Sequence, residues 1–147
     1  MTRRKATIPV TGSRTTTTGR DRGGVTDDLR LLADGELSLY GQIPSASNLT
    51  LVCEVRLGER SSRCVYKPVR GEQPLWDFPD GTLAGREVAS YLIDEALGWE
   101  LIPPTVLRAQ GPPEAELGPG MLQRWVDQPE AVDGLEPVEL VPVTEIP

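Results

Sequence analysis

The chain has 147 residues, a net charge of −7, 38% apolar residues and no histidine. Its length suits one small domain, and the absence of histidine excludes Cys/His metal clusters and Ser-His or Cys-His nucleophile pairs. No apolar stretch approaches the roughly 18 residues of a membrane span and no signal peptide is recognisable, so we expect a soluble, cytoplasmic protein without a metal site.

The first 26 residues are predicted to form a disordered basic tail. Thr, Arg and Gly dominate residues 1–24, in which six side chains are basic and one is acidic, whereas the rest of the chain is acidic. A segment without a periodic apolar face cannot offset the entropy lost on ordering. Because the acidic body would repel phosphate backbones, no specific nucleic-acid binding is expected.

The folded domain is expected to span residues 27–127. It begins with a short helical turn at 29–32, where two preceding aspartates favour a helix N-terminus. Three strands are then predicted from alternating apolar and polar residues, at 37–43, 49–55 and 63–67.

A tight turn at 58–59 would join the second and third of these strands. This turn places Cys53 opposite Cys64 across the hairpin. Two buried thiols are the interpretation that suits a cytoplasmic chain, and a disulfide is the alternative.

One main helix is predicted over residues 82–97. Thr82 or Asp80 can cap its start, Gly98 is suited to its end, and an apolar stripe at helical spacing comprises Ala84, Val88, Tyr91, Leu92 and Ala96. Two further strands are predicted at 105–107 and 121–126, before an acidic, proline-containing segment at 128–147. The expected fold is α+β, with about five antiparallel strands, one main helix and disordered tails.

Lys67 is one of only two lysines beside thirteen arginines, and it lies in an apolar strand. A compact ammonium at such a position suggests a point-charge contact with phosphate. The alternative is an edge-strand lysine whose charge prevents aggregation.

The order of elements is that of a protein-kinase-like small lobe. In that lobe a loop between the first two strands covers the phosphates, a third-strand lysine contacts them, and a helix glutamate holds the lysine. Lys67 and Glu87 occupy the corresponding elements, and Val65 shares the face of Lys67. Alternatively, Glu87 is a solvated helix acid paired with Arg86.

Residues 65–74, Val-Tyr-Lys-Pro-Val-Arg-Gly-Glu-Gln-Pro, resemble the lysine strand of phosphatidylinositol 3-/4-kinase-like proteins, especially the type II 4-kinases, where Lys-Pro is followed shortly by Glu-x-Pro. Residues 63–98, with Trp-Asp-Phe-Pro-Asp-Gly-Thr-Leu-Ala-Gly-Arg-Glu at 76–87, are similar to an uncharacterised actinobacterial family of that class. The resemblance covers roughly residues 29–145.

The resemblance implies ATP as the ligand of the domain. It assigns Lys67 to the α/β-phosphates and Glu87 to the ion pair. The other implied contacts are Val65 against the adenine, a loop over the phosphates with Ser45, Ser47 and Asn48, and an adenine hinge within 123–126 that includes Gln123 and Trp125. An ordinary hairpin turn is the alternative for the loop.

The catalytic aspartate, asparagine and acidic metal ligand of such kinases have no counterpart here, and Asp77, Asp80, Asp127 and Asp133 lack the required neighbours. Residues 128–147 are interpreted as the start of a missing or truncated large lobe. We therefore expect no catalytic residue and no phosphotransfer by this chain alone, with Mg²⁺ used only by a full-length relative and an unknown phosphoryl acceptor. Self-association through the exposed inter-lobe face is also expected.

Two alternatives to an enzyme lobe follow from the same residues. One is a non-catalytic, nucleotide-binding pseudokinase fragment. The other is a small β-rich interaction domain, in which the aromatic side chains pack in the core or contact a partner: Trp76, Phe78, Trp99 and Trp125.

Overall fold

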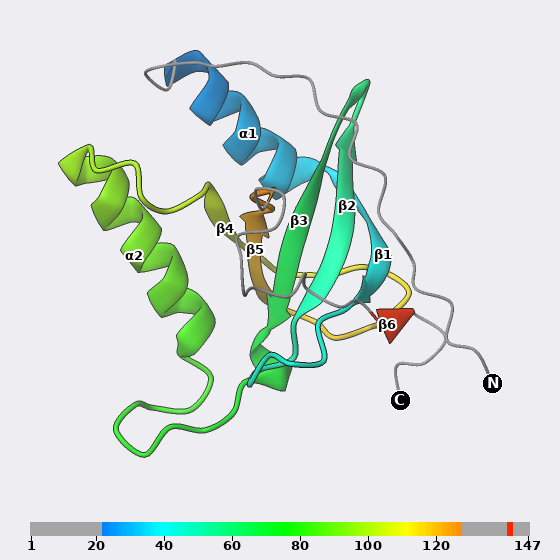
Figure 1. Cartoon of the computed structure of the whole chain (residues 1–147), viewed down its shortest axis with the longest axis vertical. Coiled ribbons are helices and arrows are strands. Elements are labelled where there is room, and N and C mark those ends of the chain that lie inside the picture. The colour runs from blue at the N-terminus through cyan, green and yellow to red at the C-terminus, as the bar shows by residue number, and fades with distance from the viewer. Residues whose placement is uncertain (1–21, 128–140, 143–147) are drawn as a thin grey trace, which may run out of the picture.

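A computed structural model describes residues 22–127 and 141–142 and shows an α+β domain built on one antiparallel sheet (Figure 1). The strands lie in the order β4-β5-β3-β2-β1-β6. The elements are α1 (Arg22–Asp34), β1 (Glu36–Gln42), β2 (Leu51–Leu57), β3 (Arg60–Pro68), the 3₁₀ turn η1 (Val69–Gly71), α2 (Leu83–Leu97), β4 (Thr105–Arg108), β5 (Gly120–Arg124) and β6 (Val141–Pro142). The five predicted strands are therefore present, and β6 adds a two-residue strand beside β1.

The helix α1 is longer than the predicted turn and begins at Arg22, within the first 26 residues for which disorder was predicted. The prediction was wrong for residues 22–26 because Val25, Leu29 and Leu32 are spaced for one helix face, a pattern that starts before the aspartates. The remainder of the basic tail, residues 1–21, lies outside the described residues, as do 128–140 and 143–147.

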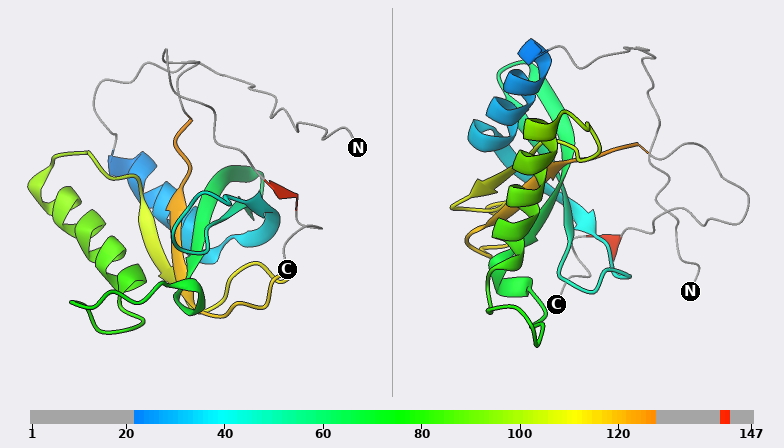
Figure 2. Two further views of the ribbon diagram at one scale, coloured as in Figure 1. Left: turned by 60° about the horizontal axis from the view of Figure 1, so that its bottom comes forward. Right: turned by 90° about the vertical axis from the view of Figure 1, so that its left-hand side faces the viewer.

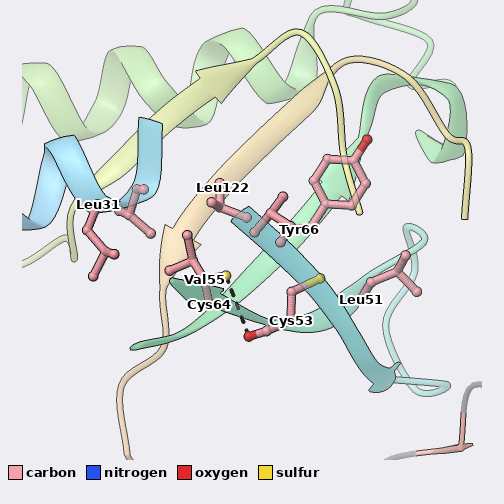
Figure 3. Close-up of a cluster of buried hydrophobic side chains, with 9 residues drawn as sticks. Leu31, Leu51, Cys53, Val55, Cys64, Tyr66 and Leu122 are labelled. Carbon is pink, nitrogen blue, oxygen red and sulfur yellow. Dashed lines mark hydrogen bonds between the residues drawn. The ribbon is translucent and has the colours of Figure 1, made fainter. Parts of the chain in front are cut away.

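The two helices pack on opposite faces of the sheet, which Figure 2 shows from two further directions. Side chains alternate along β3, so Tyr66 lies on the face that α1 covers while Lys67 points toward α2. The cluster on the α1 side is shown in Figure 3 and includes Leu31, Leu32, Leu51, Cys53, Val55, Cys64, Tyr66 and Leu122. The Lys67 face is therefore the one left for a site beside α2.

The β2–β3 hairpin has the predicted register. Cys53 faces Cys64, and the turn lies between Leu57 and Arg60. Both cysteines are free and buried, and the Cys64 thiol donates to the Cys53 carbonyl at 3.5 Å (Figure 3). Burial raises the pKa of Cys53 to about 12 and also raises the pKa of Cys64, so both thiols remain protonated near neutrality.

Ionic and polar contacts fix α1 at its middle and at its C-terminal end. Asp28 contacts Arg60 and Arg124 at 3.2 and 3.0 Å. At the C-terminal end, Arg108 of β4 donates from Nη1 to the carbonyl oxygens of Leu32 and Gly35, at 3.0 and 2.7 Å. A cation at a helix C-terminus satisfies carbonyls that lack an intrahelical partner and opposes the negative end of the helix dipole.

Candidate functional site

Lys67 and Glu87 form the ion pair that the sequence predicted. The ammonium Nζ lies 3.0 Å from Glu87 Oε2 and 3.2 Å from Oε1. The Lys67 and Glu87 side chains are 31% and 33% exposed, respectively. The pair therefore joins the centre of the sheet to α2 while leaving the ammonium accessible to a ligand.

The alternatives for these two residues do not fit the structure. Lys67 lies on β3, between β2 and β5, and therefore does not protect a sheet edge. Arg86 stacks over the Phe78 ring at 4.3 Å, and its Nε donates to Thr82 at 3.3 Å. Glu87 thus pairs across the fold with the strand lysine.

The start of α2 is capped by a residue that the sequence did not single out for this role. Glu72 accepts from the backbone N–H of Ala84 at 2.8 Å and of Leu83 at 3.3 Å. Thr82 makes no side-chain cap bond, and its hydroxyl donates instead to the Pro79 carbonyl at 2.7 Å. The predicted cap was therefore wrong, and the glutamate of the Glu-x-Pro motif caps the helix that carries Glu87.

The end of α2 is held by Gly98 and Asp94. Gly98 has φ of 66° and ends the helix in the left-handed conformation, as predicted. The buried Asp94 carboxylate accepts from the N–H groups of Leu101 and Ile102 at 3.0 to 3.1 Å. Both ends of the helix are thus fixed by side-chain or backbone contacts, which keeps Glu87 in place opposite Lys67.

An apolar surface adjoins the ion pair on the same face of the sheet. Val65 is two residues before Lys67, and its cross-strand neighbour is the buried Val52. Met121, fully buried, is the neighbour of Lys67 on β5. Val65 therefore lies on the face of Lys67, and its contact with an adenine ring stays a prediction.

The loop between β1 and β2 contains the predicted residues Ser45, Ser47 and Asn48. The two serines are exposed, and the structure gives their hydroxyls no hydrogen-bond partner among the described residues. Asn48 Oδ1 accepts from the Gln73 N–H at 2.8 Å. The serine hydroxyls are therefore available to a ligand, whereas the Asn48 carboxamide oxygen already accepts a hydrogen bond within the domain.

The predicted adenine hinge is partly occupied by contacts within the sheet. Gln123 donates from Nε2 to the Thr105 hydroxyl at 2.9 Å, and the Trp125 N–H donates to the Arg63 carbonyl at 3.0 Å. Val126 follows and is 58% exposed. The Gln123 carboxamide and the Trp125 backbone N–H therefore already donate within the sheet.

Two depressions lie along α2. One measures about 550 Å³ and lies between the start of α2 and β4 and β5; the other measures about 160 Å³ and lies under the β3–α2 connection. Neither is lined by Lys67 or Glu87. The ion pair is therefore not part of either depression.

Most of the prominent aromatic side chains do not pack in the core. Trp76 is 97% exposed, and Trp99 and Phe78 are also exposed, whereas Trp125 is half-buried. Core packing, one of the two interpretations from sequence, is therefore wrong for Trp76, Trp99 and Phe78.

Neither a group of three metal-ligating side chains nor a membrane-spanning helix is present within the described residues. Within 22–127 and 141–142, no three His, Cys, Asp or Glu side chains are grouped so that they could bind a metal ion. Asp77, Asp80 and Asp127 are exposed, and Asp133 lies outside these ranges. In the same part of the chain, no helix has the length and apolar character needed to cross a membrane.

Comparison with known proteins gives one informative relative. Protein Rv2133c of Mycobacterium tuberculosis (strain ATCC 25618 / H37Rv) is 60% identical over 108 residues, which are 73% of this chain and 37% of that protein. The chain thus spans well under half the length of the curated relative that it matches. No protein family matches the chain, and no solved structure matches it.

Proposed function

We propose that the domain is the ATP-binding small lobe of a phosphatidylinositol 3-/4-kinase-like phosphotransferase. The observation that carries this proposal is the two-oxygen contact of Lys67 with Glu87, which joins a central strand to the helix that follows it. An ammonium held in this way has its position fixed by the carboxylate and keeps an exposed side from which it can contact phosphate oxygens.

The surroundings of the pair suit the remainder of a nucleotide. Val65 offers an apolar surface to the adenine ring, and the exposed Ser45 and Ser47 offer hydroxyl donors to phosphate. Because the Trp125 N–H is used within the sheet, the adenine hinge would lie in the backbone that follows, at Val126. In this arrangement Lys67 supplies charge, and the remaining contacts supply shape and orientation.

Phosphotransfer would require residues beyond this domain. In the described ranges no three His, Cys, Asp or Glu side chains are grouped to hold a metal ion, and the carboxylate in contact with Lys67 is that of Glu87 rather than of a catalytic aspartate. The matched relative is longer than the matched region, which is compatible with a second lobe in proteins of this kind. The chain itself would bind nucleotide without transferring phosphate, and its phosphoryl acceptor is not assigned.

The test is a calorimetric measurement of the equilibrium binding of ATP to the 147-residue chain, with and without Mg²⁺. We expect Lys67→Met to weaken binding by about tenfold or more, the effect of one lost charge-assisted contact. Arg30→Ala, which removes an exposed cation on α1, serves as the matched control and should leave affinity unchanged. Equal affinity of the wild-type chain and Lys67→Met would contradict the proposal.

The exposed aromatic residues favour a second candidate, a protein-interaction domain. Trp76 is almost fully exposed on the β3–α2 connection, near the exposed Leu75 and Phe78. Exposed aromatic side chains are enriched at protein interfaces. Lys67-dependent ATP binding by this chain is expected both for the kinase-like lobe and for a pseudokinase-like fragment, whereas absence of binding would leave the interaction domain.

A further inference from the structure

The β1–β2 loop and the start of α2 are both hydrogen-bonded to one short segment, Gly71–Gln73. This segment begins at the last residue of η1 and leads away from the strand that carries Lys67. It is referred to below as the coupling segment. It connects the loop with the predicted phosphate contacts to the helix with the ion-pair carboxylate.

On the loop side, two hydrogen bonds fix the coupling segment. The Leu49 N–H donates to the Gly71 carbonyl at 3.1 Å, and the Gln73 N–H donates to Asn48 Oδ1 at 2.8 Å. A Cβ at Gly71 would lie only 2.4 Å from the Leu49 Cβ, so the two backbones approach as closely as a glycine allows. The loop cannot move far without moving this segment.

On the helix side, Glu72 fixes the same segment to α2. Its carboxylate accepts the first two N–H groups of the helix, Leu83 and Ala84, at 3.3 and 2.8 Å. Glu87 lies about one turn further along the same helix. Because Glu72 and Gln73 are neighbours in the chain, a shift of the loop would be transmitted through one peptide unit to the helix cap.

We propose that the coupling segment sets the position of Glu87 according to the position of the β1–β2 loop, with Asn48 and Glu72 as positioning residues. The inference rests on the proposed function in one respect: a phosphate group held by the loop would, through this segment, favour the paired arrangement of Glu87 and Lys67. The coupling itself is a property of the chain without ligand and can be measured there.

The test is amide hydrogen exchange of the ligand-free 147-residue chain. Asn48→Ala removes the acceptor of the Gln73 N–H, and we expect the amides of Leu83 and Ala84 to exchange about fivefold faster, the effect of losing one typical hydrogen bond. Asn48→Asp keeps an oxygen acceptor and should restore slow exchange. Gln73→Ala keeps the backbone N–H and is the matched control, with exchange at α2 unchanged.

Two results would overturn the coupling. One is unchanged exchange at the start of α2 in Asn48→Ala. The other is equal acceleration in α1 and α2, which would indicate general destabilisation. ATP titration of the wild-type chain and the same variants separates the two proposals. If Asn48→Ala speeds exchange at the start of α2 but the wild-type chain binds no ATP, the coupling stands and the proposed function is rejected. If the wild-type chain binds ATP through Lys67 but Asn48→Ala leaves exchange unchanged, the proposed function stands and the coupling is rejected.

Discussion

Lys67 and Glu87 lie twenty positions apart in the sequence, yet the ammonium contacts both carboxylate oxygens, at 3.0 and 3.2 Å. About a third of each side chain is exposed, so water screens the pair. A contact of this kind adds little to the stability of the fold. Its effect on ligand affinity can therefore be measured separately from its effect on the free energy of unfolding.

The first prediction follows from this separation. Lys67→Met and Glu87→Gln should each change the free energy of unfolding by no more than about 1 kcal/mol, because partly exposed ion pairs contribute little. The measurement is urea denaturation followed by circular dichroism. A loss of several kcal/mol in either variant would show that the pair is primarily structural and would weaken the proposed role in nucleotide binding.

The second prediction concerns Asp94, a carboxylate that is only 2% exposed and accepts two backbone N–H groups beyond the end of α2. Asp94→Ala should lower the free energy of unfolding by about 1 to 3 kcal/mol, because buried N–H donors would lose their acceptor. Asp94→Asn, which retains one oxygen acceptor, should cost less.

The control for Asp94 is Glu59→Ala, a change of another acidic residue in the exposed hairpin turn. It should alter stability by less than about 0.5 kcal/mol, as is usual for surface positions. Equal stability of Asp94→Ala and Glu59→Ala in the same denaturation experiment would contradict the structural role assigned to the buried carboxylate.

The sheet could be predicted from sequence because its signals are local. Alternation of apolar and polar residues marks each strand, and the turn at Gly58 fixes the register that brings Cys53 opposite Cys64. The pairing of Lys67 with Glu87 required more than these patterns, since it came from the order of elements and the family resemblance. The α+β class and the central ion pair could therefore be predicted from the sequence, whereas the kinase-like lobe stays a prediction.

The contacts that position the site were not accessible in the same way. Glu72 caps α2 from eleven and twelve positions away, and Arg108 caps α1 from more than seventy positions away. Such contacts join a side chain to backbone groups of a distant element, and no local periodicity encodes them. For the same reason Thr82, which has the residue type and place of a cap, was a wrong prediction.

The third prediction is a loss of stability in alkali. Burial raises the pKa of Cys53 from 9.0 to about 12 and that of Tyr66 from 10.0 to about 12, and it also raises the pKa of Cys64. The unfolded chain therefore releases these protons at lower pH than the folded chain. Their contribution to stability is complete below about pH 9 and is lost as pH rises toward 12.

The measurement is the thermal midpoint of unfolding between pH 8 and pH 10.5. The midpoint should fall with pH in the wild-type chain and fall less steeply in the double variant Cys53→Ala, Cys64→Ala, which removes the two thiols. Identical slopes in the two proteins would show that the thiols do not contribute. A thiol reagent at pH 8 should likewise modify the cysteines only after unfolding, because both are buried and protonated.

The fourth prediction is self-association of the isolated chain. The second half of α2 and the residues after it expose five large apolar side chains, each at least 53% exposed: Leu92, Ile93, Leu97, Trp99 and Leu101. Exposed apolar side chains in such number favour contact with another surface. In the proposed lobe this surface would be available for a second lobe, and in the isolated chain we expect a second copy to cover it.

Sedimentation equilibrium over a range of concentrations measures this association. The apparent mass of the wild-type chain should rise with concentration above 16.0 kDa. Leu92→Ser combined with Ile93→Ser should restore the monomer, because both side chains are more than half exposed and their removal leaves the core intact. Ala89→Ser, a small change at an exposed position of the same helix, is the control and should associate like the wild type. A wild-type chain that remains monomeric at the highest concentration would contradict this prediction. Charge repulsion between copies of this acidic protein would then outweigh the apolar contact. In that case the α2 surface would no longer support an inter-lobe role.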